Sequence, residues 1–68
     1  MIKREVLMAE VALKQTSVEA IAKKIGISKT AFYRKMNGQS DFYRKEILDI
    51  CACLGLSKQK MGEIFFGF

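Results

Sequence analysis

The sequence predicts an all-α protein, a compact bundle of five short helices that forms one domain over residues 1–68. Its 68 residues leave room for a single hydrophobic core. It contains no proline, and its five glycines fall at or near the points where a helical pattern of apolar residues breaks. Half of its residues are hydrophobic and 28% are charged, which is the balance of a folded globular chain. These observations favour helices joined by very short turns.

The first helix is expected from about Ile2 to Lys14, because its apolar residues recur with helical spacing. These residues form one stripe: Ile2, Val6, Leu7, Val11 and Leu13. The segment also carries Glu5 and Glu10, so it has neither the apolar centre of a signal peptide nor the acid-poor pattern of a transit peptide. No apolar stretch reaches the roughly 18 residues of a membrane span. We therefore expect a cytoplasmic protein with no membrane contact.

The second helix is expected to begin at Thr16 or Ser17, since either hydroxyl can accept a hydrogen bond from the free backbone amides of a first turn. Glu19 lies three residues after Thr16, which is the spacing of a capping box. Gly26 ends the helix. The apolar side chains of this helix are expected to face the core: Ile21, Ala22 and Ile25.

The third helix is expected to be capped by Ser28 and to run to about Met36. Phe32 and Met36 are its only large apolar side chains and form an i, i+4 pair, so they are expected to face the core. The remaining side chains are expected to face outward: Lys29, Thr30, Tyr33, Arg34 and Lys35. A helix with such a polar surface indicates an external binding partner.

Two further helices complete the predicted bundle. The fourth is expected from about Phe42 to Leu54, where Gly55 follows as its end. Its inward side chains are expected to be Ile47, Ile50, Cys51 and Leu54. Ser57 is expected to cap the fifth helix, which is expected to run from Lys58 to about Phe66. Its apolar side chains include Met61, Ile64 and Phe65.

The charge of the chain is concentrated in its middle. Twelve Lys and Arg residues against seven Asp and Glu residues give a net charge of +5 and a pI near 9.5. Residues 16–45 hold seven of the basic residues and two of the acidic ones, so the whole net charge lies there. This asymmetry points to a polyanionic partner, although a solvated basic face would carry the same composition.

The sequence lacks the side-chain combinations that most enzymes use for catalysis. There is no His, the commonest general base and metal ligand. The two cysteines, Cys51 and Cys53, are two residues apart and thus about 200° apart on a helix, where they can neither pair nor grip a metal together. We therefore expect no enzymatic activity, no cofactor and no metal site.

The second and third predicted helices have the layout of a helix-turn-helix motif. They are joined by about three residues that include Gly26, and the small residue Ala22 lies four positions before that glycine. A small side chain is needed where the two helices cross closely, and glycine adopts a left-handed turn without strain. Each apolar, small and capping position from Ile21 to Phe32 agrees with this arrangement.

Over nearly its full length the chain resembles the Cro and repressor type of helix-turn-helix regulators from phages, the XRE-like family. The resemblance is carried by four segments: Ile25-Gly26-Ile27-Ser28-Lys29-Thr30, Asn37-Gly38, Glu46-Ile47 with Ile50, and Leu54-Gly55-Leu56-Ser57. The ending Ile64-Phe65-Phe66 resembles a subgroup of small phage-encoded regulators. Two positions depart from the pattern: Val18 stands where these proteins often have Gln, and Tyr43 stands where Thr or Ser often caps the fourth helix. The resemblance implies a fold like that of the lambda repressor domain.

The resemblance makes the helix from Ser28 to Met36 a recognition helix that enters the major groove of double-stranded DNA. Arg34 suits guanine, and Thr30 and Tyr33 suit thymine methyl groups or phosphates. The expected DNA-binding residues are Ser28, Lys29, Thr30, Tyr33, Arg34, Lys35, Asn37, Gln39, Ser40, Tyr43 and Arg44. The last five are expected to graze the DNA backbone.

The sequence therefore predicts a sequence-specific transcriptional regulator that binds a two-fold DNA operator as a homodimer. The dimer is expected to form through apolar residues of the C-terminal helix: Ile64, Phe65, Phe66 and Phe68. The end of the chain at Phe68 favours a short Cro-like regulator, although an excised N-terminal domain of a longer repressor would have the same sequence. The alternative is a protein-interaction module, such as an antirepressor that binds another regulator.

Overall fold

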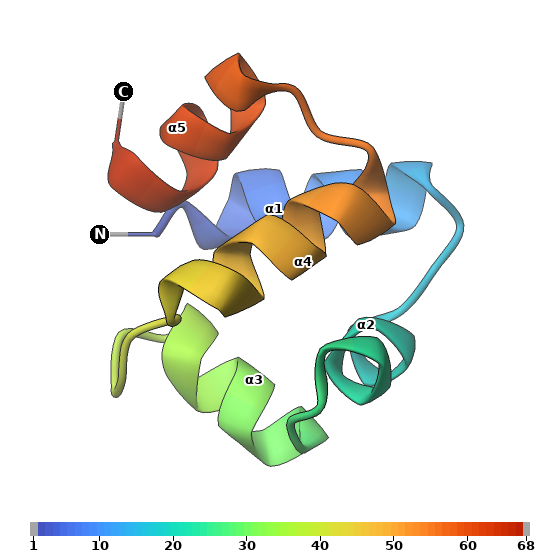
Figure 1. Ribbon diagram of the computed structural model, residues 1–68, viewed down its shortest axis with the longest axis vertical. Coiled ribbons are helices and arrows are strands. Elements are labelled where there is room, and N and C mark those ends of the chain that lie inside the picture. The colour runs from blue at the N-terminus through green and yellow to red at the C-terminus, as the bar shows by residue number, and fades with distance from the viewer. Residues whose placement is uncertain (1, 68) are drawn as a thin grey trace.

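The computed structural model describes residues 2–67, which form five α-helices and no strand (Figure 1). The helices are α1 (Arg4–Leu13), α2 (Val18–Ile25), α3 (Lys29–Met36), α4 (Arg44–Leu54) and α5 (Lys58–Phe66). This confirms the predicted all-α bundle of five short helices. None of these helices has the length and the apolar content needed to cross a membrane.

The five helices are held together mainly through α2, α4 and α5. Helix α2 packs against both α3 and α4, while α5 packs against α1 and α4. In Figure 1, α4 crosses the middle of the molecule, with α2 and α3 below it and α5 above it. The first residues are attached to α5, because the backbone N–H of Lys3 donates a 2.7 Å hydrogen bond to the carbonyl oxygen of Ile64. The helix-turn-helix pair thus lies on one side of the bundle, and the residues before α1 lie against α5.

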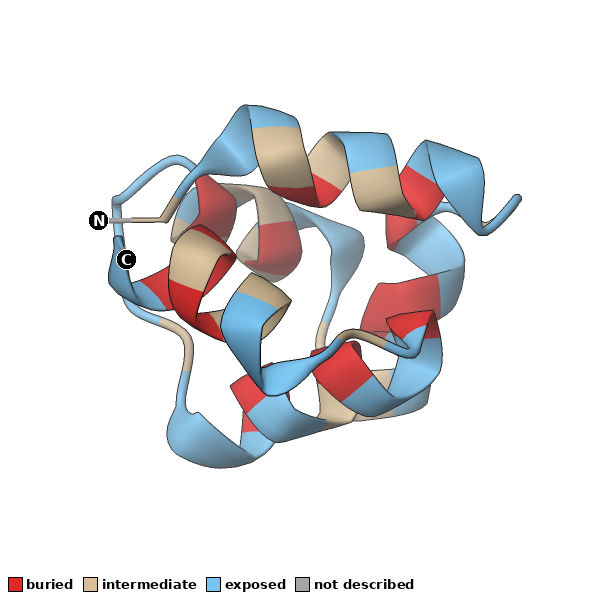
Figure 2. Cartoon of the chain, turned by 90° about the horizontal axis from the view of Figure 1, so that it is seen from above, coloured by how far each residue is buried: buried red, intermediate tan, exposed pale blue. Residues whose placement is uncertain are grey.

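The core contains side chains from every helix, and Figure 2 shows the buried positions facing the inside of the bundle. The largest fully buried side chains are Phe32, Leu7, Ile21, Met36, Ile50, Leu54 and Ile64. Three aromatic rings form a chain across the core: Phe42 meets Phe32 edge to face with ring centroids 5.2 Å apart and meets Phe65 in the same way at 5.7 Å.

The orientation of Leu13 and the expected capping box of the second helix differ from the prediction, whereas the cap at Ser17 agrees with it. Leu13 is 70% exposed, because it lies about 200° around the helix from the buried Val11 and so points away from the core. Ser17 caps α2, its hydroxyl accepting a 3.1 Å hydrogen bond from the Ala20 N–H. The expected capping box between Thr16 and Glu19 is therefore absent, since Glu19 is only the second residue of the helix.

The fourth helix begins at Arg44, two residues later than predicted. Phe42 lies in the preceding loop, where its ring fills the gap between α3 and α5. The N-cap position is occupied by Tyr43, whose side chain does not replace the usual Ser or Thr hydroxyl. Instead, the carboxylate of Glu46 accepts a 2.8 Å hydrogen bond from the Tyr43 backbone N–H.

The C-terminal helix completes the core of the protomer, which corrects part of the expected dimer surface. Ile64 is fully buried and Phe65 is 8% exposed, so neither side chain is available to a second copy. Both were expected to be interface residues because four apolar side chains crowd the end of the sequence. Phe66 is 52% exposed, and Phe68 lies outside the described residues.

The turn between α2 and α3 consists of Gly26, Ile27 and Ser28, as predicted. Gly26 has a left-handed backbone with φ of +84°, and its N–H and that of Ile27 both donate to the carbonyl of Ala22. A Cβ at Gly26 would meet no atom within 4 Å, so a substitution is penalised by backbone conformation alone.

We therefore expect Gly26→Ala to lower the free energy of unfolding by about 1–2 kcal/mol. Gly26→Asn should lose less, since Asn enters the left-handed region more readily. Urea denaturation of both variants checks this. Equal stability of Gly26→Ala and the parent chain would mean that the turn adopts a different backbone.

Candidate nucleic-acid interface

The position of α3 is fixed by the residues on its inner face. Phe32 and Met36 are buried at 0% and 2% exposure, which confirms the predicted inward pair. The helix begins at Lys29 after the N-cap Ser28, whose hydroxyl accepts a 3.0 Å hydrogen bond from the Ala31 N–H. Because the two anchors lie on one side, the opposite side of α3 faces solvent.

Most of the predicted contact residues are exposed and fall into two groups. The first lies on α3 and its cap: Ser28, Lys29, Thr30 and Arg34. The second lies in the loop after α3 and at the start of α4: Asn37, Gln39, Ser40, Tyr43 and Arg44. The structure thus brings together a polar, cationic helix face and a polar loop that follows it.

Tyr33 only partly meets the expectation of an outward side chain. It is half-buried and packs against the core cluster, so the ring sits at the edge of the helix face rather than at its centre. Tyr33 lies three positions before the buried Met36, which places its ring beside the inward face of the helix.

The expectation that Lys35 faces outward is wrong. Its Nζ atom lies 2.7 Å and 2.9 Å from the two carboxylate oxygens of Glu46, and both side chains are only 10% exposed. The ammonium group also lies 4.2 Å from the centroid of the Tyr43 ring. The Lys35 side chain is thus turned toward α4 and does not extend freely from the face of α3.

Lys29, by contrast, keeps an exposed ammonium group. Its Nζ atom lies 4.0 Å from a carboxylate oxygen of Glu19 on α2, and the two side chains are 57% and 77% exposed. An exposed pair at this distance contributes little to stability. Lys29 can therefore leave Glu19 for a phosphate at small cost.

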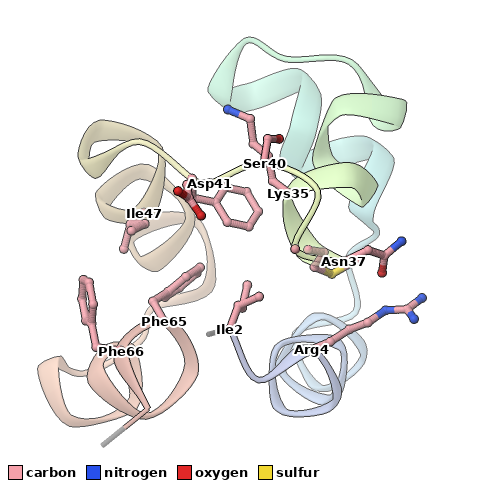
Figure 3. Close-up of a pocket in the computed structure, with 12 residues that line it drawn as sticks. Ile2, Arg4, Lys35, Asn37, Ser40, Asp41, Ile47, Phe65 and Phe66 are labelled. Carbon is pink, nitrogen blue, oxygen red and sulfur yellow. The ribbon is translucent and has the colours of Figure 1, made fainter.

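Arg4 is a cationic residue near this surface that sequence reasoning missed. It lines a pocket of about 610 Å³ beside the turn after α3, together with Asn37 and Ser40. Figure 3 shows the Arg4 and Asn37 side chains extending to the same side, away from the apolar floor formed by residues such as Ile2 and Phe65. Nothing in the sequence indicates this proximity, because Arg4 lies more than 30 positions before Asn37.

The two cysteines lie apart, as the spacing predicted. Cys51 is buried, Cys53 is exposed, and both are free thiols. Burial raises the pKa of the Cys51 thiol, which keeps it protonated at neutral pH. Within residues 2–67, no three side chains of the metal-ligating types come together.

Helices α2 and α3 are joined by a three-residue turn, and α3 is buried on one side and cationic on the other. This arrangement defines a helix-turn-helix DNA-binding domain of a transcriptional regulator. The family model for bacterial regulatory proteins of the tetR family matches residues 5–36, which here run from α1 to the end of α3. The match supports the DNA-binding helix-turn-helix class that the sequence predicted. Neither curated proteins nor solved structures give a match to the chain.

Proposed function

We propose that the protein is a sequence-specific regulator of transcription whose helix α3 reads double-stranded DNA in the major groove. The observation that supports this most directly is the two-sided character of α3. Its inner side is fixed in the core by Phe32 and Met36, and its outer side presents exposed hydrogen-bonding and cationic groups directly after a tight turn. A B-DNA major groove about 12 Å wide accepts one such helix.

The proposed base contacts come from the exposed residues of α3. The guanidinium of Arg34 can donate two hydrogen bonds to the O6 and N7 atoms of guanine. Thr30 is short enough to approach a thymine methyl group, and Lys29 can reach a base or a phosphate. Ser28 and the first backbone amides of α3 lie where a helix N-terminus binds a phosphate.

The proposed backbone contacts come from the loop after α3 and the start of α4. These residues carry hydroxyl, amide and guanidinium donors of the kind that bind phosphate oxygens: Asn37, Gln39, Ser40, Tyr43 and Arg44. We add Arg4 to this group, because it shares the pocket beside Asn37. These contacts would orient α3 in the groove without reading the sequence.

We further propose a phage Cro-like regulator in the cytoplasm that acts as a dimer on a two-fold site. One recognition helix offers too few base contacts for useful specificity, so two copies would place their α3 helices about 34 Å apart along the DNA. The resemblance of the segments around Ile25, Asn37 and Glu46 to phage regulators supports the Cro-like assignment.

The experiment that tests the proposal selects bound sequences from a random duplex library at fixed salt concentration. On the preferred site, Arg34→Ala should cost about 1–3 kcal/mol of binding free energy and relax the preference at one base pair. Arg44→Ala is the matched control, since a backbone contact should weaken preferred and random duplexes by similar factors. Equal losses on both duplexes for Arg34→Ala would contradict base reading by α3.

The same measurements separate DNA binding from the antirepressor alternative. A protein that neutralises several phosphates loses affinity steeply as the salt concentration rises. No selected sequence, together with salt-indifferent binding of another regulator, would favour the protein-interaction module instead.

A further inference from the structure

Lys35, Glu46 and Tyr43 form a compact polar cluster between α3 and α4. Both carboxylate oxygens of Glu46 accept hydrogen bonds from the Lys35 ammonium, at 2.7 Å and 2.9 Å. The oxygen at 2.7 Å also accepts the Tyr43 backbone N–H at 2.8 Å. The Tyr43 ring lies 4.2 Å from the ammonium nitrogen and covers it from one side. One carboxylate therefore holds α3 and the beginning of α4 at the same time.

Such a cluster is not explained by stability alone. Removing an ammonium and a carboxylate from water is costly, and the attraction between them roughly offsets that cost when the geometry is good. Apolar side chains of similar volume often stabilise a core as well as a buried ion pair. The nearly buried ion pair between Lys35 and Glu46 is better explained by the relative position of α3 and α4 that it maintains.

The cluster links α3 and α4, which each pack more on other helices than on each other. Helix α3 packs mainly on α2, and α4 packs on α2 and α5. Lys35 lies just before the loop of residues 37–43 and Glu46 just after it, so the ion pair closes this loop at its base. The loop carries the proposed backbone contacts, and α3 carries the proposed base contacts.

We propose that Lys35 and Glu46 are positioning residues that set the base-reading face of α3 in register with the backbone-contacting loop, without touching DNA themselves. The inference rests on the proposed function. Lys35 is poorly placed to bind a phosphate, because leaving Glu46 would strand a carboxylate of 10% exposure without its cation. Its contribution to recognition is therefore indirect.

The test compares Glu46→Gln with Glu63→Gln, a matched control that removes the same charge from an ion pair on α5. In Glu46→Gln the carbonyl oxygen of the new side-chain amide can still accept the Tyr43 N–H, so the start of α4 is kept. We expect Glu46→Gln to lower the ratio of specific to random-duplex affinity by about tenfold relative to the control. Amide hydrogen exchange in residues 37–43, measured without DNA, should accelerate in Glu46→Gln and stay unchanged in Glu63→Gln.

Two further variants at Lys35 sharpen the test. Lys35→Arg should retain the specificity ratio, because a guanidinium can donate two hydrogen bonds to the same carboxylate. Lys35→Met combined with Glu46→Gln leaves no buried charge unpaired, and it should fold while showing the same loss of specificity as Glu46→Gln. Relative to the parent chain, in which Glu46 holds the Lys35 ammonium, the dependence of affinity on salt should be unchanged in this double variant.

Two results would overturn the inference. The first is that Glu46→Gln and Glu63→Gln show the same ratio of specific to random-duplex affinity and the same amide exchange in residues 37–43. The second is a salt slope that falls by about one in the double variant, which would make Lys35 a phosphate contact. A parent chain that selects no DNA sequence would overturn the proposed function instead, and the exchange measurement would then show whether the cluster still holds the loop.

Discussion

Phe32→Ala is expected to lower the free energy of unfolding by about 3–5 kcal/mol, the range for removing a buried aromatic ring from a core. Phe32 is fully buried, and its ring meets Phe42 edge to face at 5.2 Å. The loss is comparable to the total stability of roughly 3–10 kcal/mol expected for a domain of 68 residues. Most of the variant should therefore be unfolded at room temperature.

The expected result is checked by thermal and urea unfolding followed by circular dichroism. Phe32→Leu is the matched control, because it keeps an apolar side chain and should lose clearly less stability. DNA binding should disappear in Phe32→Ala together with the fold, since α3 has no other large anchor near its middle. A cooperative transition within a few degrees of the parent would place the Phe32 ring outside the core.

The helices were predictable because local signals and apolar spacing agree along most of the chain. Ser28 and Ser57 cap α3 and α5 as expected, and the left-handed Gly26 and Gly55 lie where α2 and α4 end. Phe42 was misassigned to a helix, because its place is determined by the distant rings of Phe32 and Phe65 rather than by its neighbours. Local sequence does not carry such long-range contacts.

The candidate site was predictable in outline for the same reason. The helix-turn-helix spacing identified α3, and the two apolar residues of α3 established which side faces solvent. The direction of the Lys35 side chain could not be read from helical periodicity, because it depends on Glu46, eleven positions later. Arg4 lines the same pocket as Asn37 only through tertiary packing, which no local pattern reveals.

Removing the residues after Glu63 is expected to abolish the fold. The deletion takes away Ile64, which is fully buried and whose carbonyl accepts the 2.7 Å hydrogen bond from Lys3, and Phe65, whose ring lies 5.7 Å from that of Phe42. Loss of a single buried Ile or Phe side chain costs about 2–5 kcal/mol, so the two together cost about as much as the whole stability expected for a domain of this size.

Point variants separate this structural role of the C-terminal helix from a role in dimer formation. Phe65→Ala should cost about 3–5 kcal/mol, whereas Phe66→Ala, at a position that is 52% exposed, should cost about half of the 1.5–3 kcal/mol that full burial contributes. Sedimentation and urea unfolding of the parent and both variants give the oligomeric state and the stability in parallel. Because Phe65 belongs to the protomer's own core, its replacement should destabilise the chain equally at low and high protein concentration. A destabilisation that grew with protein concentration, accompanied by loss of a dimer, would instead assign Phe65 to the contact between two copies.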